Sequence, residues 1–151
     1  MTKFRTILLV EDNAKDVELT LEALADSRLA NRVDVTRNGI EALDYLRCEG
    51  AYRERPRLNP AAILLDIKMP LMDGIEVLEA IRADESLQTI PVVMLTSSRE
   101  QPDLKRCYAA GANAFVVKPV DFKEFIDAVR HTGVFWALIN EVPPDAGGSH
   151  E

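Results

Sequence analysis

Five polar side chains that could share one chemical task lie at or just after the ends of short apolar runs. They are Glu11 and Asp12 after the first run, Asp66 after the third, Thr96 at the end of the fourth, and Lys118 after the fifth. If the fold brings the three carboxylates together, each pair at ~4 Å costs on the order of 4 kcal/mol at an effective dielectric of about 20. Such a cluster must take up protons or bind a cation. Hard oxygen ligands without histidine or thiolate favour Mg²⁺ over zinc or copper, and the ammonium and hydroxyl suit an incoming phosphoryl group.

The apolar runs themselves predict the strands that position these side chains. They cover residues 6–10, 33–35, 62–65, 91–95 and 114–117. Runs that are apolar at nearly every position are typical of strands buried on both faces, as in a parallel sheet covered by helices. The run at 33–35 is the weakest and is compatible with an edge strand.

Amphipathic segments separate the runs, with apolar residues at helical spacing over 14–24, 40–47 and 75–82. Three pairs resemble capping boxes, Asp73 with Glu76, Ser98 with Gln101 and Asp121 with Glu124, and Gly111 is placed to end a helix. The resulting order, five strands each followed by a helix, predicts an α/β fold with one parallel sheet. In such sheets chemistry lies at the carboxyl ends of the strands, near the topological switch point.

Four motifs resemble the receiver domain of two-component response regulators, over residues 5 to about 130. They are Ile-Leu-Leu-Val-Glu-Asp-Asn at 7–13, Leu-Leu-Asp-Ile-Lys-Met-Pro-Leu-Met-Asp-Gly at 64–74, Val-Val-Met-Leu-Thr at 92–96, and Ala-Gly-Ala-Asn-Ala-Phe-Val-Val-Lys-Pro at 110–119. The resemblance implies a doubly wound five-stranded (βα)₅ fold of the flavodoxin-like (CheY-like) kind. It also implies Mg²⁺-dependent transfer of a phosphoryl group from a histidine kinase phosphohistidine, which switches a protein–protein surface.

The resemblance also assigns roles to individual positions. Asp66 matches the phospho-acceptor, Glu11 and Asp12 match the acidic metal pair, and the backbone carbonyl of Lys68 matches a further metal ligand. Thr96 and Lys118 match the catalytic switch hydroxyl and the phosphate-binding lysine, and Phe115 matches the aromatic switch position. Two features depart from the common pattern. The pair is Glu-Asp rather than Asp-Asp, and phenylalanine at 115 excludes a switch that needs a tyrosine hydroxyl.

There are three alternatives to this function. An aspartate-nucleophile phosphatase of the haloacid-dehalogenase type needs an acid two residues after the nucleophile, where this chain has Lys68. A dinucleotide-binding module needs glycines in the first strand–helix turn, and that turn has none. A receiver-fold scaffold that is not phosphorylated remains an alternative. On the favoured hypothesis the protein is no enzyme beyond catalysing its own phosphotransfer and dephosphorylation.

Two further segments suggest a subgroup and an assembly. The Arg-rich connection at 48–60, either a solvated or a recognition loop, and the Phe-Trp-containing C-terminal extension resemble regulators paired with bacterial phytochromes. A helix continuing past Gly133 would present a second apolar face, and we expect a homodimer through residues of this region, namely Phe135, Trp136, Leu138 and Val142. The alternative is that Gly133 breaks the helix and the segment folds back. The receiver domain is then expected to span 1–142, followed by a disordered tail at 143–151.

Composition narrows the partners and the compartment. The net charge of −7, without a basic stripe, argues against nucleic acid as a partner. No signal peptide or membrane-length apolar stretch is present, so a cytoplasmic protein without a membrane partner is expected. Cys48 and Cys107 lie in no metal-binding or disulfide pattern and are expected to be free thiols, and His131 and His150 are isolated.

Overall fold

A computed structural model of the chain describes residues 5–25, 31–97 and 103–130. Within these ranges strands and helices alternate, as the sequence predicts. The strands are β1 (Arg5–Val10), β2 (Asn31–Thr36), β3 (Ala62–Asp66), β4 (Val92–Thr96) and β5 (Ala114–Val117). The helices are α1 (Ala14–Ala25), α2 (Gly39–Arg47), the short 3₁₀ helix η1 (Gly50–Tyr52), α3 (Gly74–Ala83), α4 (Asp103–Ala109) and α5 (Phe122–Val129). No helix in these ranges is long and apolar enough to cross a membrane.

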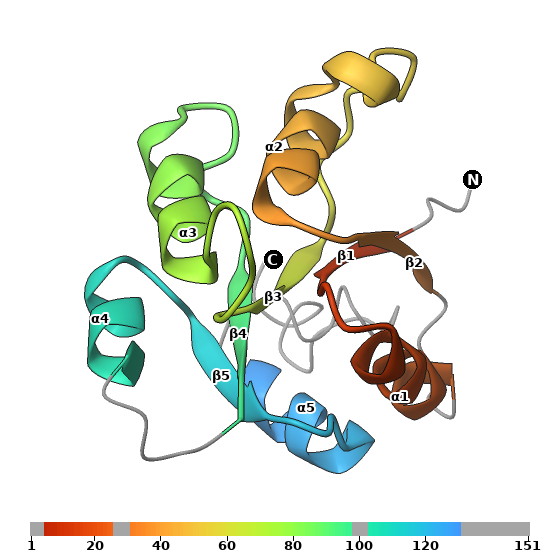
Figure 1. The fold of residues 1–151 in the computed structure, drawn as a ribbon, viewed down its shortest axis with the longest axis vertical. Helices are drawn as coiled ribbons and strands as arrows, with labels where there is room; N and C mark the ends of the chain where they lie inside the picture. Colours follow the sequence, from red (N-terminus) through yellow and green to blue (C-terminus); the bar gives the residue numbers. More distant parts are fainter. Residues whose placement is uncertain (1–4, 26–30, 98–102, 131–151) are drawn as a thin grey trace, which may run out of the picture.

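The strands form one sheet in the order β2-β1-β3-β4-β5, and every neighbouring pair is parallel (Figure 1). The predicted parallel α/β fold is therefore confirmed, and the weakest apolar run does form an edge strand, β2. The chain moves from β1 outward to β2 and then crosses to β3 on the other side of β1. The order thus reverses between β1 and β3, which is where open α/β sheets place their binding crevices.

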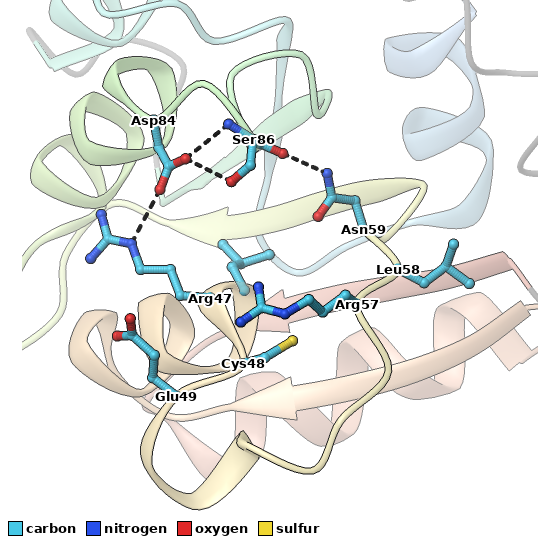
Figure 2. A pocket seen from close by; sticks show the side chains of 9 residues that line it. Arg47, Cys48, Glu49, Arg57, Leu58, Asn59, Asp84 and Ser86 are labelled. Atoms are coloured by element: carbon cyan, nitrogen blue, oxygen red, sulfur yellow. Dashed lines mark hydrogen bonds and ion pairs between the residues drawn. The ribbon is translucent and has the colours of Figure 1, made fainter.

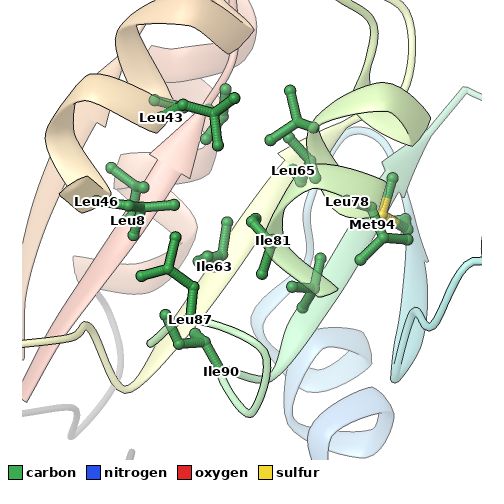
Figure 3. Close-up of a cluster of buried hydrophobic side chains, with 14 of the residues drawn as sticks. Leu8, Leu43, Leu46, Ile63, Leu65, Leu78, Ile81, Leu87, Ile90 and Met94 are labelled. Atoms are coloured by element: carbon green, nitrogen blue, oxygen red, sulfur yellow. The ribbon is translucent and has the colours of Figure 1, made fainter. Parts of the chain in front are cut away.

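Helices cover both faces of the sheet. In Figure 1, α2, α3 and α4 lie on one side, and α1 and α5 on the other. Side chains alternate between the two faces along each strand. Ile63 and Leu65 of β3 pack beneath α2 and α3, whereas Ala62 and Leu64 face α1 and α5. Figure 3 shows the first of these cores, and its fully buried leucines and isoleucines explain why the strands are apolar at nearly every position.

Capping side chains set the starts of the helices. Asp73 accepts a hydrogen bond from the backbone N–H of Glu76, and the carboxylate of Glu76 accepts one from Asp73, so the predicted capping box is confirmed. Asp121 caps α5 by accepting from the N–H of Glu124 at 3.0 Å. The third predicted pair, Ser98 with Gln101, lies outside the described residues. Gly111 ends α4 with φ +108°, the left-handed conformation predicted for it.

The Arg-rich connection after α2 is packed rather than merely solvated. The Tyr52 ring meets the Tyr45 ring edge to face at 5.2 Å, and the Arg55 guanidinium lies 4.0 Å above the Tyr45 ring. Arg55 Nε donates to the Tyr45 carbonyl oxygen, and the Tyr52 hydroxyl donates to Glu41 at 2.6 Å. Residues 53, 54, 57 and 58 remain exposed. The connection is therefore an ordered extension of α2, and a recognition role for it stays a prediction.

A hollow of about 630 Å³ lies at the amino-terminal edge of the sheet, between the ends of α2 and α3 (Figure 2). Polar groups on its wall bind one another. Arg47 Nε lies 3.3 Å from Asp84, whose other oxygen accepts from the N–H and hydroxyl of Ser86. Asn59 donates to the Ser86 carbonyl oxygen at 2.8 Å. This network ties the connections before β3 and β4 together, at the edge of the sheet opposite the acidic residues.

One arginine joins α3 to the segments that precede β4 and β5. Arg82 Nη1 donates to the carbonyl oxygens of Gln88 and Ile90, at 3.1 and 2.7 Å. Its Nε and Nη2 donate to the Gly111 carbonyl oxygen, and Nη2 also donates to Asn113 Oδ1. These carbonyl oxygens lie in connections between helices and strands, and a planar guanidinium with several fixed donors can bind all of them at once.

Arg82→Lys should therefore lower the free energy of unfolding by about 1–2 kcal/mol, because an ammonium cannot reach all four acceptor groups at once. Urea unfolding followed by circular dichroism measures the change. Arg53→Lys, at an exposed position of the Arg-rich connection, serves as the matched control and should change stability by less than about 0.5 kcal/mol. Equal stability of the Arg82→Lys protein and the wild type would show that this junction does not depend on the guanidinium.

Candidate functional site

A hollow of about 260 Å³ opens at the carboxyl ends of β1, β3, β4 and β5. Six of the residues that the sequence singled out line it: Glu11, Asp12, Asp66, Lys68, Thr96 and Lys118. They come from four separate parts of the chain, and only the parallel sheet brings them to one place. The fold therefore gathers these candidate residues at the switch point of the sheet.

Backbone hydrogen bonds that continue the sheet past the strand ends fix these residues. The N–H of Glu11 donates to the Thr36 carbonyl oxygen at 3.0 Å. The N–H of Lys118 donates to the Thr96 carbonyl oxygen at 2.7 Å. Each functional side chain therefore begins from backbone that is held on the sheet, so its position is restricted before any ligand binds.

The start of α3 packs directly against the loop that follows Asp66. The N–H of Gly74 donates to the Ile67 carbonyl oxygen at 2.8 Å. A Cβ atom at position 74 would collide with the carbonyl oxygen of Asp66 and lie 2.9 Å from the Ile67 Cα. Glycine is required here because of this close approach, a role that the sequence motif contained but that we did not predict.

Three carboxylates meet in the hollow. Glu11, Asp12 and Asp66 each offer an oxygen atom, and these atoms lie within 4.8 Å of one another. Glu11 is fully buried and Asp66 is 3% exposed, so water can do little to screen the repulsion between them. The N–H of Asn13 donates to Glu11 Oε2 at 3.2 Å and orients that side chain.

Lys118 supplies the positive charge that holds this cluster together. Its Nζ lies 3.2 Å from Glu11 Oε1, 3.2 Å from Asp66 Oδ1 and 2.9 Å from Asp16 Oδ2. Burial lowers the pKa of the Lys118 ammonium, but hydrogen bonding to Asp16 and the charges of Asp66 and Glu11 outweigh it and raise the pKa above its usual value. The ammonium therefore stays charged at any physiological pH.

The pKa values of the two buried carboxyls are also raised, which in their case favours the neutral form. Burial, followed by repulsion from Asp66, raises the pKa of Glu11 from 4.5 to about 7. Burial also raises the pKa of Asp66, although Lys118 and a hydrogen bond from Glu11 oppose the shift. The pair is therefore easier to protonate than carboxyls in water.

This donor set fits a hard divalent cation. Glu11, Asp12 and Asp66 would hold it through carboxylate oxygens, and Lys68, whose carbonyl the sequence predicts as a ligand, lines the same hollow. Burial and repulsion from Asp66 raise the pKa of Glu11, and a bound cation would oppose that shift. The predicted Mg²⁺ site is therefore chemically reasonable for this arrangement.

The two predicted switch residues lie in different surroundings. Thr96 is 1% exposed and lines the hollow. Phe115 lies on β5 outside the hollow, where its ring meets Tyr108 of α4 edge to face, with centroids 6.0 Å apart. Phe115 is thus separated from the carboxylates but packs against an exposed aromatic side chain on a neighbouring helix. Tyr108 was not anticipated from the sequence.

Asp16 is the site residue that sequence reasoning missed. It lies in the first turn of α1, and its N–H donates to Asn13 Oδ1 at 2.9 Å, so Asn13 caps the helix. The available signal was an acidic residue three positions after Asn13, which itself directly follows the Glu11-Asp12 pair. It resembled an ordinary helix-start acid, and only the fold places Lys118 beside it.

The C-terminal assignments cannot be compared with the structure. The expected dimer residues Phe135, Trp136, Leu138 and Val142 and the expected tail at 143–151 lie outside the described residues. Within the described residues, Cys48 and Cys107 are both buried and neither is in a disulfide, as predicted.

Comparisons with known proteins agree with this geometry. The family model described as "Response regulator receiver domain" matches residues 7–130. The probable methanogenesis regulatory protein FilR2 of Methanothrix harundinacea is 39% identical over 141 residues, covering 93% of this chain and 88% of FilR2. Response regulator Rcp1 of Synechocystis is 36% identical over 132 residues, covering 87% of this chain and 88% of Rcp1.

Solved structures agree as well. The bacteriophytochrome response regulator AtBRR superposes with a TM-score of 0.85 at 57% identity, covering 93% of this chain and all of that one. The structure of Rcp1 in its Mn²⁺-bound form superposes with a TM-score of 0.72 at 34% identity, covering 93% of this chain and 99% of that one. The fold of the described residues is thus the receiver fold.

Burial raises the pKa of Glu11 to about 7, so cation binding should depend on pH. Because a divalent cation must displace a proton from Glu11 in this range, the apparent Mg²⁺ affinity should rise about tenfold between about pH 6 and pH 8. Stability without metal should change in the opposite sense. A carboxyl whose pKa is raised on folding makes the protein lose stability as pH rises from 4.5 toward about 7. Isothermal titration calorimetry at about pH 6 and pH 8 measures the affinity, and thermal melts without metal between pH 4.5 and about 7 measure the stability.

Glu11→Gln is the control for this titration, because the amide resembles the protonated side chain. It should bind Mg²⁺ more weakly than the wild type at pH 8 and with little dependence on pH. A wild-type affinity that stays constant over this range would contradict the raised pKa of Glu11.

Proposed function

The chain belongs to the response regulator receiver family, and from that premise we propose that Asp66 is the residue on which it accepts a phosphoryl group from the phosphohistidine of a histidine kinase. One observation carries the proposal. Asp66 is a buried carboxylate at the switch point, in contact with one lysine and within 4.8 Å of two further carboxylates. Isolated helix-capping aspartates have no such surroundings.

The reaction forms one bond and breaks another. An oxygen of Asp66 attacks the phosphorus of a phosphohistidine whose other ring nitrogen carries a proton. The bond from phosphorus to nitrogen breaks, the nitrogen keeps the electron pair, and the protonated ring leaves as a neutral imidazole. Lys118, already beside Asp66, pairs with oxygens of the transferred group. A Mg²⁺ ion held by Glu11, Asp12 and Asp66, with the predicted carbonyl of Lys68, would neutralise charge on the same oxygens. Water later hydrolyses the aspartyl phosphate.

We propose that the signal leaves the site through Thr96. The Thr96 hydroxyl is buried at the hollow and can donate to an oxygen of the new phosphoryl group, which favours a Thr96 position closer to Asp66. Phe115 then moves into the space released, and its contact with Tyr108 changes. A local charge event would thereby alter a surface of α4, β5 and α5 that a partner protein can recognise.

The two rival hypotheses are less consistent with the site. A phosphatase with an aspartate nucleophile needs an acid where this chain has Lys68, whose side chain is exposed. A receiver-fold scaffold without phosphorylation has no need for buried carboxylates, which cost stability unless a ligand uses them. We therefore propose that the protein catalyses only its own phosphotransfer and dephosphorylation.

The names of its relatives suggest the kinase class. AtBRR is described as a bacteriophytochrome response regulator, and a phosphorylated cyanobacterial phytochrome response regulator, RcpA, is 36% identical with a TM-score of 0.71. We propose a bacterial phytochrome with histidine kinase activity as the phosphoryl donor, acting in the reducing cytoplasm, where free thiols such as Cys48 and Cys107 persist. We propose neither nucleic acid nor a membrane as a partner.

Asp66→Asn should abolish phosphorylation and leave the fold intact, because the amide has nearly the same shape but cannot act as the nucleophile. The measurement is intact-protein mass after incubation with Mg²⁺ and acetyl phosphate. Asp127→Asn, an exposed position on α5, is the matched control and should label like the wild type. If a well-folded Asp66→Asn protein is labelled to the same extent as the wild type, Asp66 is not the phospho-acceptor. Transfer rates from purified phosphorylated phytochrome kinases then identify the donor.

Assembly is a separate proposal. The apolar residues Phe135, Trp136, Leu138 and Val142 form a pattern typical of a partner surface, and we propose that they join two copies of the chain. Phe135→Asp with Leu138→Asp should give a soluble monomer that still accepts phosphate. Light scattering at tens of micromolar tests this, and a wild-type protein that is monomeric with and without phosphorylation refutes it.

A further inference from the structure

Lys118 has its shortest ionic contact with a residue outside the predicted acidic set. Its Nζ lies 2.9 Å from Asp16 Oδ2, compared with 3.2 Å from both Glu11 and Asp66. Asp16 precedes Lys118 by 102 residues. Its side chain is 28% exposed, whereas those of Glu11 and Asp66 are 0% and 4% exposed. The ammonium is thus shared between a buried pair of carboxylates and a more exposed third one.

The start of α1 does not require the Asp16 carboxylate. In a capping box the third residue of the helix would accept a hydrogen bond from the N–H of the cap residue, Asn13. Here the N–H of Asn13 donates to Glu11 Oε2 instead, and Asn13 uses its side chain to accept from the N–H of Asp16. The backbone of Asp16 is therefore anchored while its carboxylate is left to contact Lys118.

Two cations need the same carboxylates. A divalent ion in the cluster and the ammonium of Lys118 would both bind oxygens of Glu11 and Asp66, so each weakens the other. A third carboxylate that holds the ammonium from another side reduces this competition. It also keeps the ammonium beside Asp66, where a transferred phosphoryl group would need it.

We propose that Asp16 is a positioning residue for Lys118. It holds the ammonium at the more exposed side of the cluster, so that Glu11 and Asp66 are available to a divalent cation while Lys118 remains within reach of the phosphoryl group. The inference rests on the proposed function, because that function requires Lys118 to move from the carboxylates to a phosphoryl group. It gives Asp16 of α1 a role in phosphotransfer that acts through Lys118 and not through contact with the substrate.

The test is a double-mutant cycle read by Mg²⁺ affinity. Asp16→Asn keeps the size of the side chain and removes its charge, and Lys118→Met removes the ammonium. Calorimetric titration with Mg²⁺ alone, at about pH 8 where Glu11 is ionised, should show about fivefold weaker binding for Asp16→Asn than for the wild type. In the Lys118→Met background the same substitution should change the affinity by less than about twofold.

Glu18→Gln is the matched control, because it removes one carboxylate from an exposed position of the same helix. It should leave Mg²⁺ affinity nearly unchanged. Thermal melts without metal show that each variant folds. Unchanged affinity in Asp16→Asn overturns the proposal, and so does an equal loss in the wild-type and Lys118→Met backgrounds, which would mean that Asp16 acts by its charge alone.

Acetyl phosphate labelling of the wild type separates this inference from the proposed function. If the wild type is labelled and the cycle shows no coupling, only the role of Asp16 is wrong. If the wild type is not labelled although the cycle shows coupling, the phospho-acceptor assignment fails while the positioning of Lys118 by Asp16 stands.

Discussion

The site depends on one balance of charge: buried carboxylates at the carboxyl edge of a parallel sheet face the ammonium of Lys118. Glu11 and Asp66 are almost completely removed from water, and their repulsion is relieved only in part by Lys118. The cluster is therefore poised to gain positive charge. A divalent cation adds positive charge to such a cluster, and a phosphoryl group redistributes the charge within it. These are the two ligands to which the cluster responds most strongly.

The surrounding fold offsets the loss of stability that this arrangement causes. Carboxylates that repel one another destabilise the folded state, so they persist only where rigid structure prevents them from separating. Here the strand ends are held by backbone hydrogen bonds that extend the sheet, and two apolar cores lie on its faces. The close approach of Gly74 to Asp66 and the junction made by Arg82 add rigidity around the loops. Stability generated away from the site thus allows strain to remain within it.

Charge also connects the separate behaviours of the site. A proton on Glu11, a bound divalent cation and the ammonium of Lys118 would all compete for the same oxygen atoms, so a change in one would alter the others. On our proposal Asp16 of α1 affects this competition through Lys118, although α1 contributes no residue that takes part in the reaction. The readout that we propose toward Phe115 and Tyr108 would begin from the same place, because Thr96, the last residue of β4, lines the hollow.

The sequence by itself determined the fold class, the order of strands and helices along the chain and the edge of the sheet where the candidate site lies. Central strands are apolar at nearly every position, helices are amphipathic, and the candidate site residues Glu11, Asp12, Asp66, Thr96 and Lys118 end the strands or come just after them, so local pattern was sufficient. Only the tertiary structure decided that Asp16 contacts Lys118, that burial raises the pKa of Glu11, and that the connection after α2 packs on its own helix. Each of these depends on distance and burial between segments far apart in the chain, which residue types and spacing do not contain.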